Sequence, residues 1–299
     1  MTNNKIHREY KDRLFTFLFG QNENRSWTLS LYNAVNNTDY RNPDEVQINT
    51  IKEVLYLGMH NDVSFLILEE MNLFEQQSSF NPNMPLRQMQ YASNLFEKYI
   101  KEHKYNKYGS SLIRLPVPKL ITFYNGTEDK PDEMILELKN SFPQGAKPDI
   151  AVKVRMININ YDKNQRLLDA CRPLKEYSWL IAEIRSILHD MNIEQAVDEA
   201  IKAMPDKFEI KSFLDAHRME VRAMLLTEYN ETETMELFRM EGFEKGHIEG
   251  VEEGRLQICY EDYCNKELSA EKAAAKLHLP TAESFLEACR SQGWPVENR

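Results

Sequence analysis

Acidic and amide side chains gather in one short stretch of the chain, NDVSFLILEEMNLFEQQS at residues 61–78. Two apolar runs flank a polar centre, a pattern typical of a β-hairpin. With a turn at Glu69-Glu70, Phe65 and Phe74 meet on one face of the ribbon, because side chains alternate between the faces of a strand. On the other face the same pairing sets Asp62 across from Gln77 and Ser64 across from Glu75.

Two carboxylates held this close repel each other unless a positive charge lies between them or one keeps its proton. A divalent cation such as Mg²⁺ satisfies that condition, since it takes one or two carboxylates, backbone oxygens and water and leaves room for a phosphate. The structural alternative is equally simple. An Asp at the start of a strand and a Glu on its exposed face are common, so the spacing alone leaves both interpretations open.

The surrounding sequence predicts the elements that must position these acids. Apolar periodicity favours a helix from Tyr10 to Leu18, ended by Gly20, and a second helix from Ser26 to Val35. Pro85 suits the first turn of a helix that runs to about Lys101. Besides the hairpin, strands are expected at 46–57, 112–126 (with Asn125-Gly126 as its turn), 135–142 and 150–161.

From about residue 164 the sequence becomes a series of amphipathic helical runs. We therefore expect an α/β part at 1–165, a helical region at 166–255 and a small helical hairpin at 256–299, in which Ser269 and Thr281 cap the two helices. A hairpin of this layout either packs as structure or reads DNA as a helix-turn-helix. Its few basic residues favour packing.

Four glycines, Gly242, Gly246, Gly250 and Gly254, lie four residues apart in a predicted acidic helix. Each costs a helix interior about 1 kcal/mol relative to alanine, so the spacing needs a reason. Close approach of a second helix would make this a self-association segment, and a homodimer through the helical C-terminal region is then expected. The alternative is a duplicated connector. The glutamates and lysine around the glycines argue against a membrane dimerisation motif.

The composition narrows the function classes. No apolar run approaches a membrane span, no secretory signal is recognisable, and the four cysteines form no CxxC pair, so a protein of the reducing cytoplasm without membrane partners is expected. Neither a GxxxxGK[ST] phosphate loop nor a GxSxG nucleophile elbow occurs. The net charge of −10 includes −7 between Glu228 and Gly254 (nine Glu against Arg239 and Lys245), so the remaining −3 leaves room for a local basic face.

Most of the chain, about residues 8 to 254, resembles the bacterial recombination-promoting nuclease (Rpn-type) family, whose members are also described as transposase-like. This family belongs to the PD-(D/E)xK nuclease superfamily. The resemblance is carried by the glycine-spaced acidic tail and by these segments: YKDRLFTFLFG, SLYNAVNNTDY, GMHNDVSFLI, NLFEQQSSFNPNMPLRQMQYASNLFEKYI, LPVPKLITFYNG, MININY and LLTEY. It implies a restriction-endonuclease-like α/β core, with a mixed β-sheet flanked by helices, in residues 1–165.

The resemblance also implies a Mg²⁺-dependent DNA endonuclease, with Mn²⁺ as a substitute, that acts in recombination, mobile elements or phage defence. Asp62 matches the first metal-binding aspartate of the superfamily and Glu75 the second acidic ligand. The main-chain carbonyl of Gln76 completes the protein part of the metal shell. Gln77 falls where many superfamily members have a catalytic lysine, and it lacks the charge to stabilise hydroxide.

Two further residues are candidates by the same comparison. Asp12 aligns with an acidic residue of the family's first helix and either assists the metal or has a structural function. Arg87 is placed to contact a DNA phosphate or to form a salt bridge within the fold. The missing lysine keeps a second hypothesis open, a catalytically weak DNA-binding or oligomerisation protein of the same fold.

Overall fold

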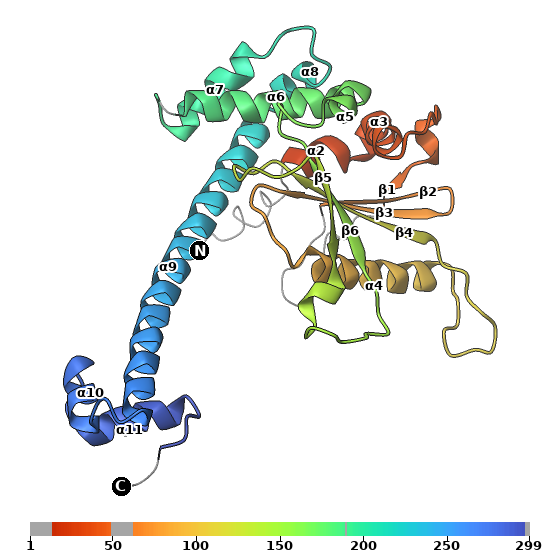
Figure 1. The fold of residues 1–299 in the computed structure, drawn as a ribbon. Coiled ribbons are helices and arrows are strands. Elements are labelled where there is room, and N and C mark those ends of the chain that lie inside the picture. The colour runs from red at the N-terminus through yellow and green to blue at the C-terminus, as the bar shows by residue number, and fades with distance from the viewer. Residues whose placement is uncertain (1–13, 49–61, 189, 297–299) are drawn as a thin grey trace, which may run out of the picture. The chain divides into compact units, whose positions relative to one another are not determined.

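The computed structural model describes residues 14–48, 62–188 and 190–296 (Figure 1). The chain divides into two compact units, residues 1–232 and 233–299. The described residues form an α/β protein with a mixed six-stranded sheet, as expected.

The sheet has the order β1-β2-β3-β4-β6-β5. The first three strands are antiparallel neighbours, β4 lies parallel to both β3 and β6, and β5 pairs antiparallel with β6 at the edge. The strand bounds are β1 (Gln47–Ile48), β2 (Val63–Ile67), β3 (Glu70–Gln77), β4 (Val117–Tyr124), β5 (Glu133–Glu137) and β6 (Lys153–Asn158).

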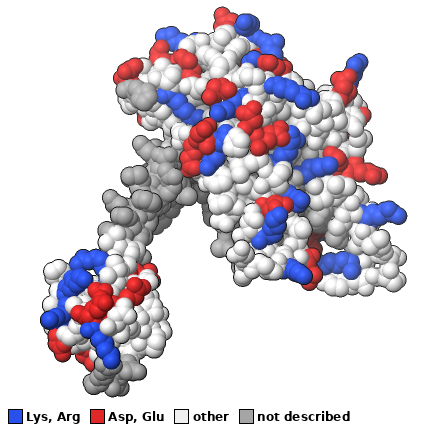
Figure 2. Space-filling view, in the orientation of Figure 1, with Lys and Arg blue, Asp and Glu red and all other residues white. Residues whose placement is uncertain are grey.

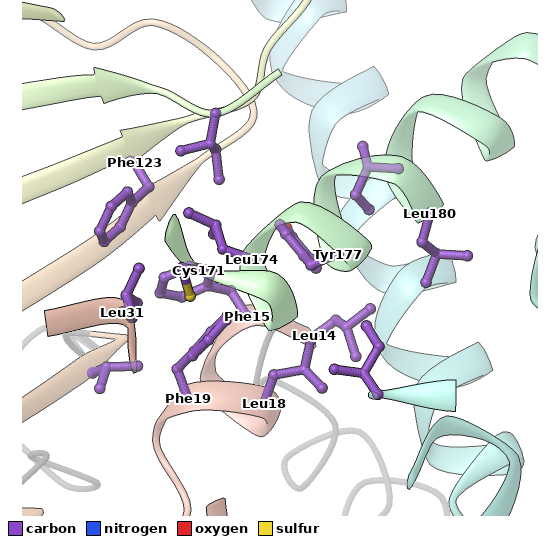
Figure 3. Close-up of a cluster of buried hydrophobic side chains, with 14 of the residues drawn as sticks. Leu14, Phe15, Leu18, Phe19, Leu31, Phe123, Cys171, Leu174, Tyr177 and Leu180 are labelled. Atoms are coloured by element: carbon purple, nitrogen blue, oxygen red, sulfur yellow. The ribbon is translucent and has the colours of Figure 1, made fainter. Parts of the chain in front are cut away.

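Helices cover the two faces of this sheet (Figure 1). On one face, α2 (Leu14–Phe19), α3 (Arg25–Asn36) and α6 (Arg172–Ile187) pack on the core-facing side chains of the strands. On the other face lies α4 (Met84–Glu102), which crosses from the end of β3 to the start of the parallel strand β4. Figure 3 shows the first of these cores, where Phe15, Phe123 and Tyr177 meet.

The β2–β3 hairpin is confirmed, but its register differs from the predicted one. Val63 pairs with Phe74 and Ile67 with Glu70, so the two turn residues are Leu68 and Glu69. Leu68 adopts a positive φ of 52°. The pairing is shifted by two residues, and the predicted pairs of Asp62 with Gln77 and of Ser64 with Glu75 are wrong. An even shift leaves every side chain on its predicted face, because the alternation has a period of two.

Other predicted elements are confirmed with small changes. The helices expected at 26–35 and 85–101 correspond to α3 and α4, and Pro85 lies in the first turn of α4. The helix expected at 10–18 is α2 from Leu14 on, and residues 10–13 lie outside the described residues. The predicted strand at 112–126 begins only at Val117. The one at 135–142 ends at Glu137, and a 3₁₀ helix, η3 (Leu138–Ser141), follows. Of the strand expected at 46–57, only β1 falls within the described residues.

Residue 165 marks a change in secondary structure but not a change of core. One buried cluster contains sheet residues such as Phe74 together with Leu168, Tyr177 and Leu225 of the helical region. The remaining helices are η1 (Asn22–Asn24), η2 (Pro43–Glu45), α5 (Gln165–Ala170), α7 (Ile193–Ala203), α8 (Lys211–Ala216) and α9 (Arg218–Cys264), the last with residues of both units.

The second unit has its own small core. Here α10 (Ala270–Lys276) and α11 (Ala282–Ser291) bury Phe285 and Cys289 with Cys259 of α9. The predicted caps are confirmed, since Ser269 Oγ accepts from Lys272 N and Thr281 Oγ1 accepts from Ser284 N. No helix within the described ranges is long and apolar enough to cross a membrane.

Candidate metal centre

Asp62 directly precedes β2 and extends its pairing with β3 through a side chain. Its Oδ2 accepts a hydrogen bond of 2.6 Å from the backbone N–H of Gln76. In an antiparallel ladder this N–H would bond a neighbouring backbone carbonyl. The carboxylate substitutes for that carbonyl, so its position is set by the main chain of β3.

Glu75 lies on the face of β3 that α4 covers, with 2% of its side chain exposed. Its Oε1 lies 2.6 Å from Nη2 of Arg87, in the first turn of α4. The same Nη2 donates to the hydroxyl of Tyr91, one helical turn further on, at 3.0 Å. A buried carboxylate without a charged partner costs several kcal/mol, so the ion pair with Arg87 favours the buried position of Glu75.

Tyr91 connects the two acids electrostatically. Burial raises the pKa of its hydroxyl, the charges of Glu75 and then Asp62 act in the same direction, and Arg87 opposes them. Of the two carboxylates, Glu75 has the larger effect on the pKa of this hydroxyl, and Arg87 contacts both Glu75 and Tyr91. The predicted same-face arrangement of Asp62 and Glu75 stays a prediction, because the β2–β3 register covers Val63 to Ile67 and Asp62 lies before it.

Gln77 is buried at the end of β3, beside the first residue of α4. Its Nε2 donates to Met84 Sδ at 2.7 Å, while its Oε1 has no hydrogen-bond partner among the described residues. On the neighbouring strand, Thr122 pairs with Glu75, and its buried Oγ1 likewise lacks a partner in the described part of the chain. Buried polar atoms of this kind commonly bind ordered water, so water next to Glu75 is expected.

The side chain of Gln76 points to the opposite face and into the main core. Its Nε2 donates to Asn125 Oδ1 at 2.7 Å, and Asn125 Nδ2 donates to Tyr177 Oη at 3.1 Å. The backbone of the strand alternates as well: Gln77 O accepts from Asn125 N on the β4 side. The carbonyl of Gln76 therefore points to the β2 side, where Asp62 is.

The oxygen atoms at this site are of the types that bind magnesium, but the guanidinium of Arg87 already contacts one of the two carboxylates. Carboxylate and backbone carbonyl oxygens, here from Asp62 before β2 and from Glu75 and Gln76 of β3, are of the types that Mg²⁺ takes from proteins. Across residues 14–48, 62–188 and 190–296, no group of three or more His, Cys, Asp or Glu side chains is arranged to hold a metal. The guanidinium of Arg87 supplies positive charge to Glu75, and a cation would share that carboxylate with it.

The other predicted site residues have different outcomes. Asp12 lies outside the described residues. Arg87 forms the salt bridge that the sequence left as one of two alternatives, and contact with a DNA phosphate stays a prediction. Sequence reasoning missed Tyr91 and Thr122, and it interpreted Asn125 only as a turn residue, although Asn125 joins β3 to α6. Tyr91 could have been found from the sequence, because it follows Arg87 by four residues and therefore lies on the same side of the predicted helix.

Comparisons of the chain with protein-family models, with curated proteins and with solved structures found no match. The resemblance to recombination-promoting nucleases therefore depends on the sequence segments that carry it.

Proposed function

We propose that this protein is a metal-dependent DNA endonuclease with a restriction-endonuclease-like core. The observation that carries the proposal is the hydrogen bond of 2.6 Å from the N–H of Gln76 to Asp62 Oδ2, which holds one acid against the residue that follows the other, Glu75. The proposed ligands for Mg²⁺ or Mn²⁺ are both carboxylates and the carbonyl of Gln76. Function in recombination, mobile elements or phage defence follows from the sequence resemblance.

A bound cation of this type polarises a phosphodiester and activates water. The protein's own residues orient the participants. The N–H of Gln76 fixes Asp62, and the amide of Gln77 orients a water by hydrogen bonding, without the charge that a lysine would add. Arg87 is a third exposed, and a guanidinium pairs well with phosphate oxygens. A DNA phosphate that enters the site therefore competes with Glu75 for Arg87.

The second candidate is a DNA-binding protein of the same fold with weak or no catalysis. The Arg87–Glu75 ion pair favours it, because the guanidinium already neutralises the buried acid that a metal needs. Glutamine at position 77 favours it too, since an amide cannot stabilise hydroxide with a full charge.

Plasmid cleavage with Mg²⁺ or Mn²⁺ tests the endonuclease. Asp62→Asn and Glu75→Gln keep the side-chain shapes and remove the charges, so both should abolish nicking by the protein. Matched controls are Asp206→Asn and Glu220→Gln, two exposed acids that should leave cleavage unchanged. Full nicking by both site variants would remove these acids from the mechanism.

Calorimetry separates the two candidates. The endonuclease requires binding of Mg²⁺ or Mn²⁺ that Glu75→Gln weakens. A protein that binds DNA without measurable binding of either metal would be the second candidate.

A homodimer through the glycine-spaced part of α9 is also proposed. A Cβ built on Gly250 or Gly254 meets nothing within 4 Å in the single chain, so this side of the helix is open to another chain. The mass in solution of a chain truncated after Tyr229 tests this. If the truncated protein has the same number of protomers as the full-length protein, the glycine-spaced part of α9 does not form the dimer interface.

A further inference from the structure

A basic and aromatic surface lies at the opposite end of α4 from the acids. It comprises residues 98–119, the end of α4, the loop after it and the start of β4. This segment contains one acidic residue, Glu102, in a chain whose net charge is −10. Its six basic residues are Lys98, Lys101, Lys104, Lys107, Arg114 and Lys119.

Few of these charges are neutralised within the fold. Lys107 pairs with Glu97 and Lys119 with Glu70. Lys101, Lys104 and Arg114 form no ion pair with any described residue, and every residue from 101 to 112 is exposed. The loop therefore presents concentrated positive charge to solvent, which attracts a polyanion at short range despite the acidic balance of the chain.

Aromatic rings are stacked along the same segment. Tyr99 and His103 have ring centroids 4.0 Å apart and an interplanar angle of 30°, and the rings of His103 and Tyr105 stack at 5.4 Å and 23°. Tyr108 is 88% exposed, with Lys107 Nζ 5.7 Å from its ring centroid. Leu112 is 90% exposed. An exposed ring among cations is available to a ligand that carries both flat surfaces and negative charge.

The surface lies at a defined distance from the candidate metal centre. Helix α4 begins beside Gln77 and ends at Glu102, and its 19 residues span about 28 Å. Figure 2 shows Lys and Arg side chains at the lower right, where Figure 1 places the end of α4 and the loop after it. A second loop at this end of the sheet, before β6, adds Lys147, because β4 and β6 run parallel.

We infer that this surface binds single-stranded DNA. Rings that stack on bases and cations that contact phosphates are the two components of single-strand binding. A duplex exposes its phosphates but keeps the faces of its bases stacked inside. It would therefore contact the basic residues but offer no base to stack on the ring of Tyr108. The inference deepens the proposed function, because it specifies unpaired DNA about one helix length from the cleavage site.

Fluorescence anisotropy in EDTA, where no cleavage occurs, tests the inference with a labelled single strand of mixed sequence and with its blunt duplex. Tyr108→Ala should weaken single-strand binding about tenfold, the effect of losing one stacked base, and change duplex binding little. Tyr108→Phe keeps the ring and should bind like the wild type.

A triple variant, Lys101→Glu, Lys104→Glu and Arg114→Glu, tests the charges. It should reduce the slope of log affinity against log salt concentration by about 2, because each contacted phosphate contributes about 0.7 for single strands. Lys202→Glu, Lys207→Glu and Lys272→Glu change the net charge equally at exposed positions elsewhere and should leave the slope unchanged.

The outcomes separate this inference from the proposed function. Asp62→Asn should bind the single strand like the wild type. If the protein binds the single strand but never cleaves DNA, the proposed endonuclease function is wrong and the inference of single-strand binding stands. Equal affinity for the single strand and the duplex, or an unaltered Tyr108→Ala, overturns the inference. Loss of self-association or of binding to anionic vesicles in the triple variant, with single-strand binding retained, assigns the surface to another partner and also overturns it.

Discussion

Arg87 and Glu75 form an ion pair of 2.6 Å between the first turn of α4 and the end of β3. The carboxylate is almost fully buried, while the guanidinium keeps a third of its surface in solvent. The pair therefore ties the crossover helix to the strand that carries the candidate metal ligands. It also means that the charge of Glu75 is balanced before any cation or DNA arrives.

Arg87→Met should lower the free energy of unfolding by about 2–3 kcal/mol, because it removes the guanidinium that lies 2.6 Å from the buried carboxylate of Glu75. The value lies at or below the low end for a fully buried pair, since solvent reaches Arg87. Urea denaturation of Arg87→Met, Glu75→Gln and the double variant measures it. The double variant should lose clearly less than the sum of the single losses, and simple additivity would show that the ion pair contributes nothing.

Asp62 combines a structural and a chemical contribution that two substitutions separate. Asp62→Asn keeps an oxygen for the N–H of Gln76, so its stability should remain within about 0.5 kcal/mol of the wild type. Asp62→Ala removes the acceptor and should cost about 1–3 kcal/mol. Thermal unfolding gives the stability and calorimetry gives the metal affinity, which both variants should lose. Metal affinity retained by Asp62→Asn would contradict the assignment.

Gly126 follows Asn125 where the chain leaves β4, and it has no room for a side chain. A Cβ there would overlap the carbonyl oxygen of Ser78 and lie 2.5 Å from Tyr124 Oη. Gly126→Ala should therefore displace the residues that follow Gln77 and cost about 1–3 kcal/mol.

Gly254→Ala is the matched control, because nothing lies within 4 Å of its added Cβ and alanine favours a helix interior by about 1 kcal/mol. Denaturation of both variants should give changes of opposite sign. Two losses of equal size would show that Gly254 packs against something that the single chain does not contain.

Thiol labelling tests the burial of the cysteines. Burial raises the pKa of Cys171 and of Cys289 to about 11, whereas Cys264 is exposed. Only the thiolate reacts, so at pH 8 Cys264 should be labelled quickly in the native protein, and all four cysteines only after denaturation.

The same shift has a consequence for stability. The folded state retains the Cys171 proton that the unfolded state loses, so stability should fall as pH rises from 9 towards 11. Denaturation at several pH values measures this loss of stability. For the labelling experiment, mass spectrometry after timed reaction identifies the labelled cysteines, and rapid labelling of Cys171 in the native protein would contradict its burial.

The sequence predicted which side chains of the hairpin share a face more reliably than it predicted which residues pair across the two strands. Alternation alone predicted which hairpin side chains face the main core, and Val63, Phe65 and Phe74 are buried there together. The exact partners depended on the turn, and no Asn-Gly pair marked it. Leu68 occupies a positive φ that leucine rarely adopts, so local rules favoured the wrong turn residues.

Long-range polar contacts were the part that the sequence could not supply. Asn125 has the composition of a turn residue, yet its side chain joins Gln76 to Tyr177, 52 residues further along the chain. Likewise, a boundary near 165 follows from the change in periodicity. Only the structure shows Leu168 and Phe74 in one buried cluster.

The hairpin also sets a rule for its own variation. Inserting two residues at Leu68-Glu69, or deleting both, lets the two strands keep their observed pairs, so the same side chains still face α4. Insertion or deletion of one residue that slipped the pairing by one would put Phe74 beside Arg87 in the position of Glu75, and it would turn the carboxylate of Glu75 to the apolar core. The hairpin should therefore tolerate insertions or deletions of an even number of residues at this turn better than those of an odd number.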